Sequence, residues 1–81
     1  MKKNIYAMKD ELRGFLSPFV EINDDVAMRS FGYAMTSNDI IGFRPQDFSL
    51  YKLGKMDEES GILEPLSSPK FIMNALPKGE E

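Results

Sequence analysis

The sequence predicts an α+β fold, in which an antiparallel β-sheet of about four strands carries one helix on one face, in the order ββαββ. Three observations lead to this prediction. Segments rich in aromatic and β-branched residues recur between clusters of turn residues. A single amphipathic segment with a strong N-terminal cap lies between them. The segment Phe48–Lys55 is apolar on both faces, which is typical of a sheet that is covered on both sides.

The composition suits one small folded domain without covalent cross-links. The chain has 81 residues, of which 42% are hydrophobic, and it contains no cysteine and no histidine. Disulfides and thiolate metal sites are therefore excluded, and the commonest general base is missing. A chain of this length buries a modest share of its surface, so oligomerisation is the stabilising device that remains. We assign residues 1–76 to a single domain and residues 77–81 to a charged C-terminal tail.

Two strands are expected before the helix. Asn4–Met8 alternates weakly between polar and apolar residues and predicts the first strand. The polar segment Lys9–Gly14 ends in glycine and suits a hairpin connection. Phe15–Ile22 predicts the second strand, and Pro18 places this strand at an edge or at a bulge because proline lacks a backbone donor.

The helix has the clearest local signal. Asn23 is a good N-cap, and Asp24 and Asp25 complement the helix dipole in the first turn. We expect the helix to run from Asp24 to about Ser37. The apolar residues that follow helical spacing are Ala27, Phe31, Ala34 and Met35, with Val26 and Met28 beside them.

The remaining elements follow from composition. In chain order they are a loop at Ile40–Gln46 with its apolar residues under the fold, a third strand Phe48–Lys55, a turn Asp57–Gly61, a short strand from Ile62, a loop Pro65–Pro69 and a last strand Lys70–Leu76.

The third strand also predicts a partner chain. Phe48 and Leu50 point to one face of the sheet, and Tyr51 and Leu53 point to the other. One helix covers only one face, and an apolar face left in water is typical of an interface. We therefore expect a homodimer in which sheets or edge strands meet at a two-fold axis.

Neither an enzyme nor a cofactor or metal site is expected. The pair Asp24 and Asp25 is explained by the helix dipole better than by a metal. The acidic run at Asp57–Gly61 lacks the alternating spacing of a calcium loop, and a solvated turn explains it better. The glycines are scattered, so no phosphate-binding loop is present. No apolar run reaches membrane-spanning length, and we expect no membrane association.

Charge and aromatic residues leave two alternatives open. The net charge is −3, and most of the excess acid lies in the last third of the chain. Cations and aromatics interleave in the first part, where guanidinium and ammonium groups would follow phosphates while rings stack bases. The candidate nucleic-acid-binding residues are Arg13, Arg29, Arg44, Lys52 and Lys55 for phosphates, and Tyr6, Tyr33 and Tyr51 for stacking. The alternative is that the rings belong to the core or the dimer interface and the cations to an ordinary surface.

Three motifs resemble a known family. They are Phe48-x-Leu50-Tyr51-x-x-Gly54-x-x-Asp57-x-x-x-Gly61, Pro18-Phe19-x-x-x-Asn23-Asp24-x-x-Ala27-x-Arg29-x-Phe31, and a late Pro69-Lys70-Phe71. In this order they resemble the small nonstructural protein of gokushoviruses, the Microviridae with small single-stranded DNA genomes. Lys55 stands where the family usually has an acidic residue. The resemblance implies a DNA-binding role in single-stranded genome synthesis or its delivery to the procapsid. Arg29 of the family motif either contacts phosphate or, by helical spacing, pairs with Asp25 one turn earlier.

Together these observations lead to two hypotheses. The first is a non-enzymatic homodimer in the host cytoplasm that binds single-stranded DNA during phage genome replication or packaging. The second is a protein-interaction module, a viral assembly factor or host-modulating factor that binds a viral or host protein through its sheet face or edge.

Overall fold

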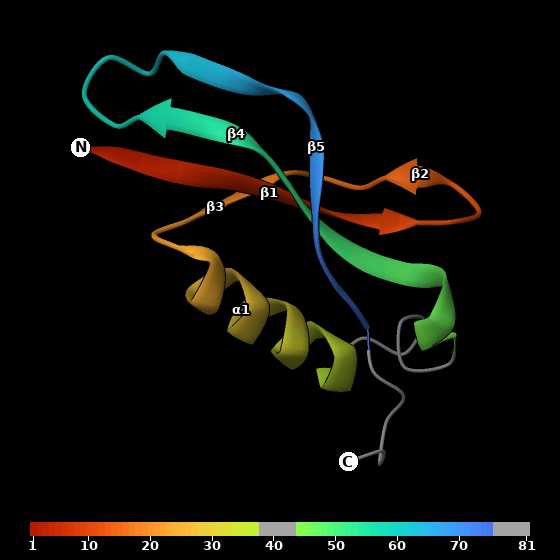
Figure 1. Ribbon diagram of the computed structural model, residues 1–81. Helices are drawn as coiled ribbons and strands as arrows, with labels where there is room; N and C mark the ends of the chain where they lie inside the picture. Colours follow the sequence, from red (N-terminus) through yellow and green to blue (C-terminus); the bar gives the residue numbers. More distant parts are fainter. Residues whose placement is uncertain (38–43, 76–81) are drawn as a thin grey trace.

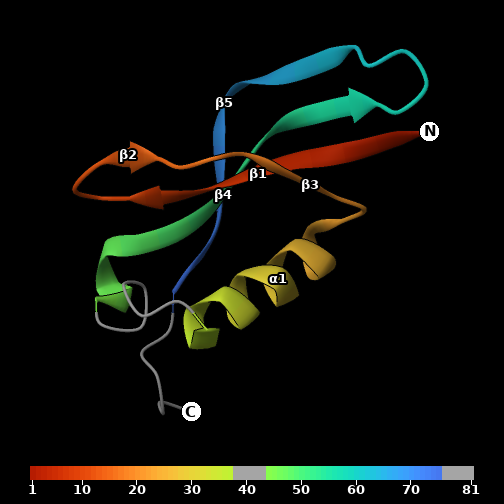
Figure 2. The same cartoon turned by 180° about the vertical axis from the view of Figure 1, so that it is seen from behind.

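The computed structural model describes residues 1–37 and 44–75. Within these residues five strands form one antiparallel sheet, and α1 lies along one side of it (Figures 1 and 2). The elements are β1 (Lys2–Asp10), β2 (Gly14–Phe15), β3 (Phe19–Glu21), α1 (Asp24–Ser37), the 3-10 turn η1 (Pro45–Asp47), β4 (Phe48–Asp57) and β5 (Leu63–Asn74). The α+β class is confirmed. Most of the predicted loop Ile40–Gln46 and the predicted tail 77–81 lie outside the described residues.

The predicted second strand is broken into two pieces. The strand order is β2-β1-β4-β5, and β3 pairs with the other end of β1 on the same edge as β2. Between them, the Leu16 N–H donates to the Met8 carbonyl over 2.8 Å, and Pro18 has no donor to offer. The chain therefore leaves the ladder at the proline and returns at Phe19. The element order is βββαββ, so the structure has one strand more before the helix than the predicted order ββαββ.

The predicted loop Pro65–Pro69 is instead extended and belongs to β5. Both prolines are compatible with this position because β5 is an edge strand, where the missing backbone donor of proline is tolerated. The ladder is irregular there: Lys52 pairs with Lys70, whereas Gly54 pairs with Pro65, and the residues between them on β5 have no partner in β4. In both views β5 bends sharply partway along its length (Figures 1 and 2).

The helix has the predicted bounds because its start is set locally. The Asn23 side-chain oxygen accepts the Val26 N–H over 2.9 Å, which satisfies one of the unpaired donors of the first turn. Ala27 and Phe31 from α1 are buried against the sheet, as their spacing predicted. The buried residues that they join in the core are Tyr6, Phe48, Leu50 and Ala75.

Candidate nucleic-acid interface

One face of the sheet is turned away from α1. Side chains alternate along β1, so Tyr6 points to the core and Ala7 and Lys9 point to the opposite face. The ladders place Tyr51 opposite Ala7 and Phe71 opposite Tyr51. We call the side of the sheet that carries Ala7, Lys9, Tyr51 and Phe71 the open face.

Three rings from three strands make contact on the open face. The ring centroids of Phe15 and Tyr51 lie 5.4 Å apart at 79°, and those of Tyr51 and Phe71 lie 5.7 Å apart at 77°. These edge-to-face contacts are favoured by the ring quadrupoles. Phe15 is 44% exposed and Phe71 is 50% exposed, whereas Tyr51 between them is partly buried. We call Phe15, Tyr51 and Phe71 the aromatic row; its two ends are accessible to a ligand.

Lys9 brings a positive charge to this row. Its Nζ lies 5.7 Å from the ring centroid of Phe15 and 5.9 Å from that of Tyr51, within the range of cation–π attraction. No carboxylate of the described residues lies within 4.0 Å of this ammonium. The adjacent carboxylate, Asp10, is engaged by the Arg13 Nε at 2.8 Å. The row therefore combines exposed aromatic surface with one cation.

Tyr6, predicted to stack bases, lies in the core. It is 0% exposed, its hydroxyl donates to Asp24, and the Asn4 amide donates to it over 3.0 Å. Burial, and then the hydrogen bond to Asp24, raise the pKa of Tyr6 to about 12. This placement counts against the predicted stacking role, because a fully buried ring has no face for a base. Tyr6 instead ties β1 to the start of α1.

Lys52 lies on the side of the sheet that faces the helix. It pairs with Tyr6 across the ladder, and alternation therefore separates it from Tyr51. It lines an open polar hollow of about 340 Å³ together with Asn4, Asn23, Asp24 and Asp25. Among the described residues no group of three acidic side chains is close enough to hold a metal ion. Lys52 is thus placed beside two aspartates and not beside the aromatic row.

Two of the predicted phosphate-binding arginines have local carboxylate partners. Arg13 pairs with Asp10 at 2.8 Å, and Arg44 lies 3.7 Å from Asp47. The bond from Arg13, together with the Leu12 N–H, holds the pKa of Asp10 below its usual value. These pairs reduce the charge that either arginine presents to a phosphate.

The other predicted residues are dispersed. Arg29 is exposed on α1, and no ion pair joins it to Asp25 within the described part of the chain. Tyr33 is 73% exposed on the same helix. Lys55 is exposed and lies opposite Asn4 in the ladder. The structure therefore does not bring the predicted set together: only Tyr51 belongs to the open face.

Sequence reasoning missed Lys9, Phe15 and Phe71. From the sequence, Phe71 stands out only within the motif Pro69-Lys70-Phe71, and Phe15 only as the start of the predicted second strand. What joins them is register: Lys9 pairs with Phe15, and Tyr51 pairs with Phe71. Alternation along a single strand cannot supply these pairings.

An apolar pocket is formed by residues of three strands, β1, β4 and β5, and by Pro18 in the connection between β2 and β3. It has a volume of about 290 Å³ and is lined by Ile5, Pro18, Leu53, Gly54, Leu63 and Pro65. Leu53 is skipped by the register of both neighbouring ladders, since Tyr6 pairs with Lys52 and Ile5 pairs with Gly54. Ile5 shares the face of Ala7 by alternation. An apolar side chain of a partner would fit this pocket.

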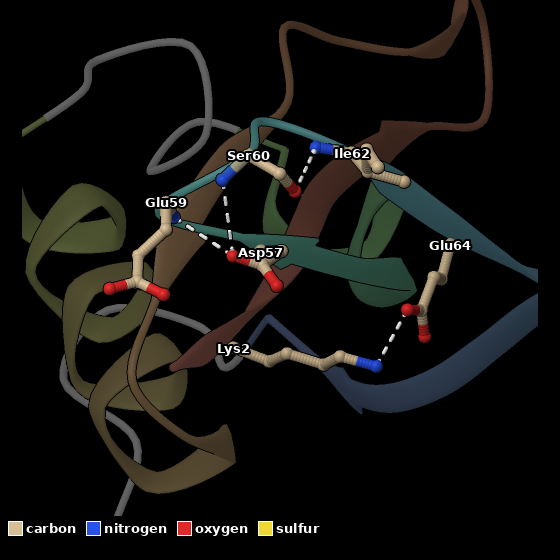
Figure 3. A network of polar contacts seen from close by, with 6 residues as sticks. All are labelled: Lys2, Asp57, Glu59, Ser60, Ile62 and Glu64. Carbon is tan, nitrogen blue, oxygen red and sulfur yellow. Dashed lines mark hydrogen bonds and ion pairs between the residues drawn. The ribbon is translucent and has the colours of Figure 1, made fainter.

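The acidic run after β4 forms a turn that uses its own carboxylate (Figure 3). Asp57 Oδ1 accepts the N–H groups of Glu59 and Ser60 over 2.9 and 3.3 Å, and these bonds lower the pKa of Asp57. Beside the turn, the Lys2 ammonium donates to Glu64 over 2.6 Å. The arrangement agrees with the predicted turn and ties the start of β1 to β5.

Comparison with known proteins identifies a family. No helix in the described residues is long and apolar enough to cross a membrane. No curated protein and no solved structure matches the chain. The family model described as phage ORF5 protein matches residues 3–77, which is nearly the whole chain. On this match, the chain belongs to the phage ORF5 protein family.

Proposed function

We propose that this phage protein is a non-enzymatic single-stranded DNA-binding protein that uses the open face of its sheet. The observation that supports the proposal is the aromatic row with Lys9 beside it. Exposed rings on a sheet offer stacking platforms for unpaired bases, and a neighbouring cation attracts the phosphate backbone. The two exposed ends of the row, Phe15 and Phe71, are the stacking residues, and Tyr51 holds them in position.

Stacking rather than charge supplies most of the affinity in this proposal. A base stacked on an aromatic side chain contributes about 1–3 kcal/mol. By contrast, the chain carries a net charge of −3, and Arg13 and Arg44 already have carboxylate partners. A protein of this kind has little long-range attraction for a duplex, whose paired bases are stacked on each other and present no free face. Unpaired bases are therefore the ligand that the open face suits.

The biological setting of the proposal comes from the resemblance to gokushoviruses. A phage of that group copies and packages a single-stranded DNA genome in the host cytoplasm, where unpaired bases are abundant. We place the protein at that stage, in genome replication or in delivery of the genome to the procapsid.

The test is a fluorescence anisotropy titration of labelled oligothymidylate at low salt with the wild type, Phe71→Ala and Tyr33→Ala. Tyr33 is the matched control because it is an exposed aromatic residue on the helix. We expect Phe71→Ala to weaken binding about 5- to 150-fold, as the loss of one stacked base implies, and Tyr33→Ala to bind as the wild type does. Circular dichroism checks that both variants fold. No binding by the wild type at micromolar concentration would refute the proposal. Weaker binding by Tyr33→Ala with unchanged binding by Phe71→Ala would also refute it.

A second candidate function is protein interaction through the apolar pocket, with a second copy of the chain as the partner. The observation that favours it is the lining of the pocket, which is apolar throughout and includes Leu63, 59% exposed. Light scattering should then give twice the chain mass of 9.2 kDa, and Leu63→Asp should return the mass of one chain. A single-chain mass for the wild type at about 100 μM would remove this candidate.

A further inference from the structure

We infer that Lys9 makes the only phosphate contact among the described residues 1–37 and 44–75, and that the aromatic row holds a short, unstacked stretch of single-stranded DNA around it. This inference rests on the proposed function and specifies its ligand geometry. It differs from the sequence-based expectation, in which five other cations contacted phosphate.

The position of Lys9 leaves its donors available. An ammonium group has three N–H donors and no acceptor. The rings of Phe15 and Tyr51 attract its charge at 5.7 and 5.9 Å but accept no conventional hydrogen bond. Among the described residues no side chain or carbonyl accepts a hydrogen bond from Lys9 Nζ. The ammonium is thus held beside two rings without a protein acceptor among the described residues, so its donors can bind a phosphate oxygen.

Ring spacing sets the conformation of the strand. Neighbouring rings of the row lie 5.4 and 5.7 Å apart, whereas bases in one strand of duplex DNA rise by about 3.4 Å per nucleotide. Because the ring of Tyr51 stands between the two stacking rings, neighbouring bases that stay stacked on each other cannot stack on both Phe15 and Phe71. A strand that uses both end rings must separate its bases, which a flexible single strand does at low cost and a duplex does not.

Two of the cations predicted from the sequence are engaged elsewhere. Lys52 lies on the helix side of the sheet beside Asp24 and Asp25, and Arg13 is held by Asp10. A single phosphate contact has a quantitative signature, because the logarithm of the binding constant of a single strand falls with the logarithm of salt concentration with a slope of about −0.7 per contact. We therefore expect a slope near −0.7, equivalent to about threefold weaker binding between about 50 and about 200 mM NaCl.

The experiment measures this slope for the full chain with a labelled oligothymidylate of about ten nucleotides. Lys9→Gln should bind more weakly at low salt with a slope close to zero, because stacking remains and the phosphate contact is lost. Lys9→Arg should restore the slope. Lys55→Gln is the matched control, an exposed lysine that lies opposite Asn4 on the other side of the sheet, and it should keep the wild-type slope.

A second probe works without any substitution. An oligothymidylate with uncharged methylphosphonate linkages should bind the wild type as weakly as Lys9→Gln binds the normal oligonucleotide, and Lys9→Gln should bind both probes equally. Equal salt slopes for Lys9→Gln and the wild type would overturn the inference, as would a wild-type slope of several units. In both cases, weaker binding by Phe71→Ala would leave the proposed function intact. No binding by the wild type would instead remove the proposed function itself.

Discussion

Replacement of Gly54 by alanine tests how closely β4 and β5 approach each other. An alanine Cβ at this position would lie 2.4 Å from the carbonyl oxygen of Glu64 and 2.8 Å from Cα of Pro65, and Cβ atoms essentially never lie within 3.0 Å of such atoms. Both contacts are to backbone, so no side-chain rotation relieves them. Gly54 is buried and pairs with Pro65 at a shift in the register of the ladder. The two strands must therefore separate.

The expected cost follows from this geometry. Separation by more than about half an ångström lengthens the neighbouring ladder hydrogen bonds beyond their favourable range. Overpacking of this kind costs about 1–3 kcal/mol, and each hydrogen bond that is lost adds about 1 kcal/mol. Alanine also restricts the unfolded chain more than glycine does, and this effect reduces the loss of stability by about 0.4–1 kcal/mol. We expect a net loss of about 2–3 kcal/mol from a total free energy of unfolding of about 4–12 kcal/mol for a chain of this length.

Urea unfolding followed by circular dichroism measures this loss. With a slope of about 1.5 kcal/mol per molar urea, the midpoint of Gly54→Ala should fall by about 1.5 M. Gly61→Ala is the control: its φ of 77° strains an alanine, but no atom lies within 4 Å of the added Cβ, so we expect a loss of about 1 kcal/mol. A Gly54→Ala variant as stable as Gly61→Ala would refute the reasoning from close approach.

Two predictions concern pH. The pKa of Tyr6 is raised to about 12 by burial and then by its bond to Asp24, so the neutral hydroxyl stabilises the fold below pH 10 and this stability is lost as pH rises toward 12. In an ultraviolet titration of the wild type one ionisation step should occur near pH 12, and Tyr6→Phe should lack that step; a wild-type titration without such a step would contradict the prediction. The pKa of Asp10 is lowered by Arg13 and by the Leu12 N–H, so its contribution is present above pH 4 and is lost as pH falls through the folded pKa. Asp10→Asn should be less stable than the wild type at pH 7, and this difference in urea midpoint should shrink on acidification; a difference that does not depend on pH would exclude the carboxylate charge as its cause.

The placement of Tyr51 illustrates how far strand patterns reach. Alternation along β4 correctly separated Tyr51 from the core residues Phe48 and Leu50, and the same alternation sends Lys52 to the helix side. The cation that does accompany Tyr51 is Lys9, which lies on another strand. A candidate site chosen by residue type alone therefore included cations from both sides of the sheet.

The sequence by itself determined the elements whose signals are local. The bounds of α1 follow from the Asn23 cap and from apolar spacing, and the long strands β1 and β4 follow from their apolar residues. These features depend on neighbours within about one turn of helix or a few positions along a strand, so they can be read before the chain is folded.

Only the tertiary structure decided which residues meet across strands. β5 runs extended through Pro65 and Pro69 because it lies at the edge of the sheet, and its position at the edge is a property of the whole sheet. The aromatic row likewise joins strands that are far apart in the chain, and a shift of one residue in either ladder would turn its rings to the opposite face. Register is set by contacts between distant segments, which is why the open face could be predicted to be apolar but its binding residues could not be named.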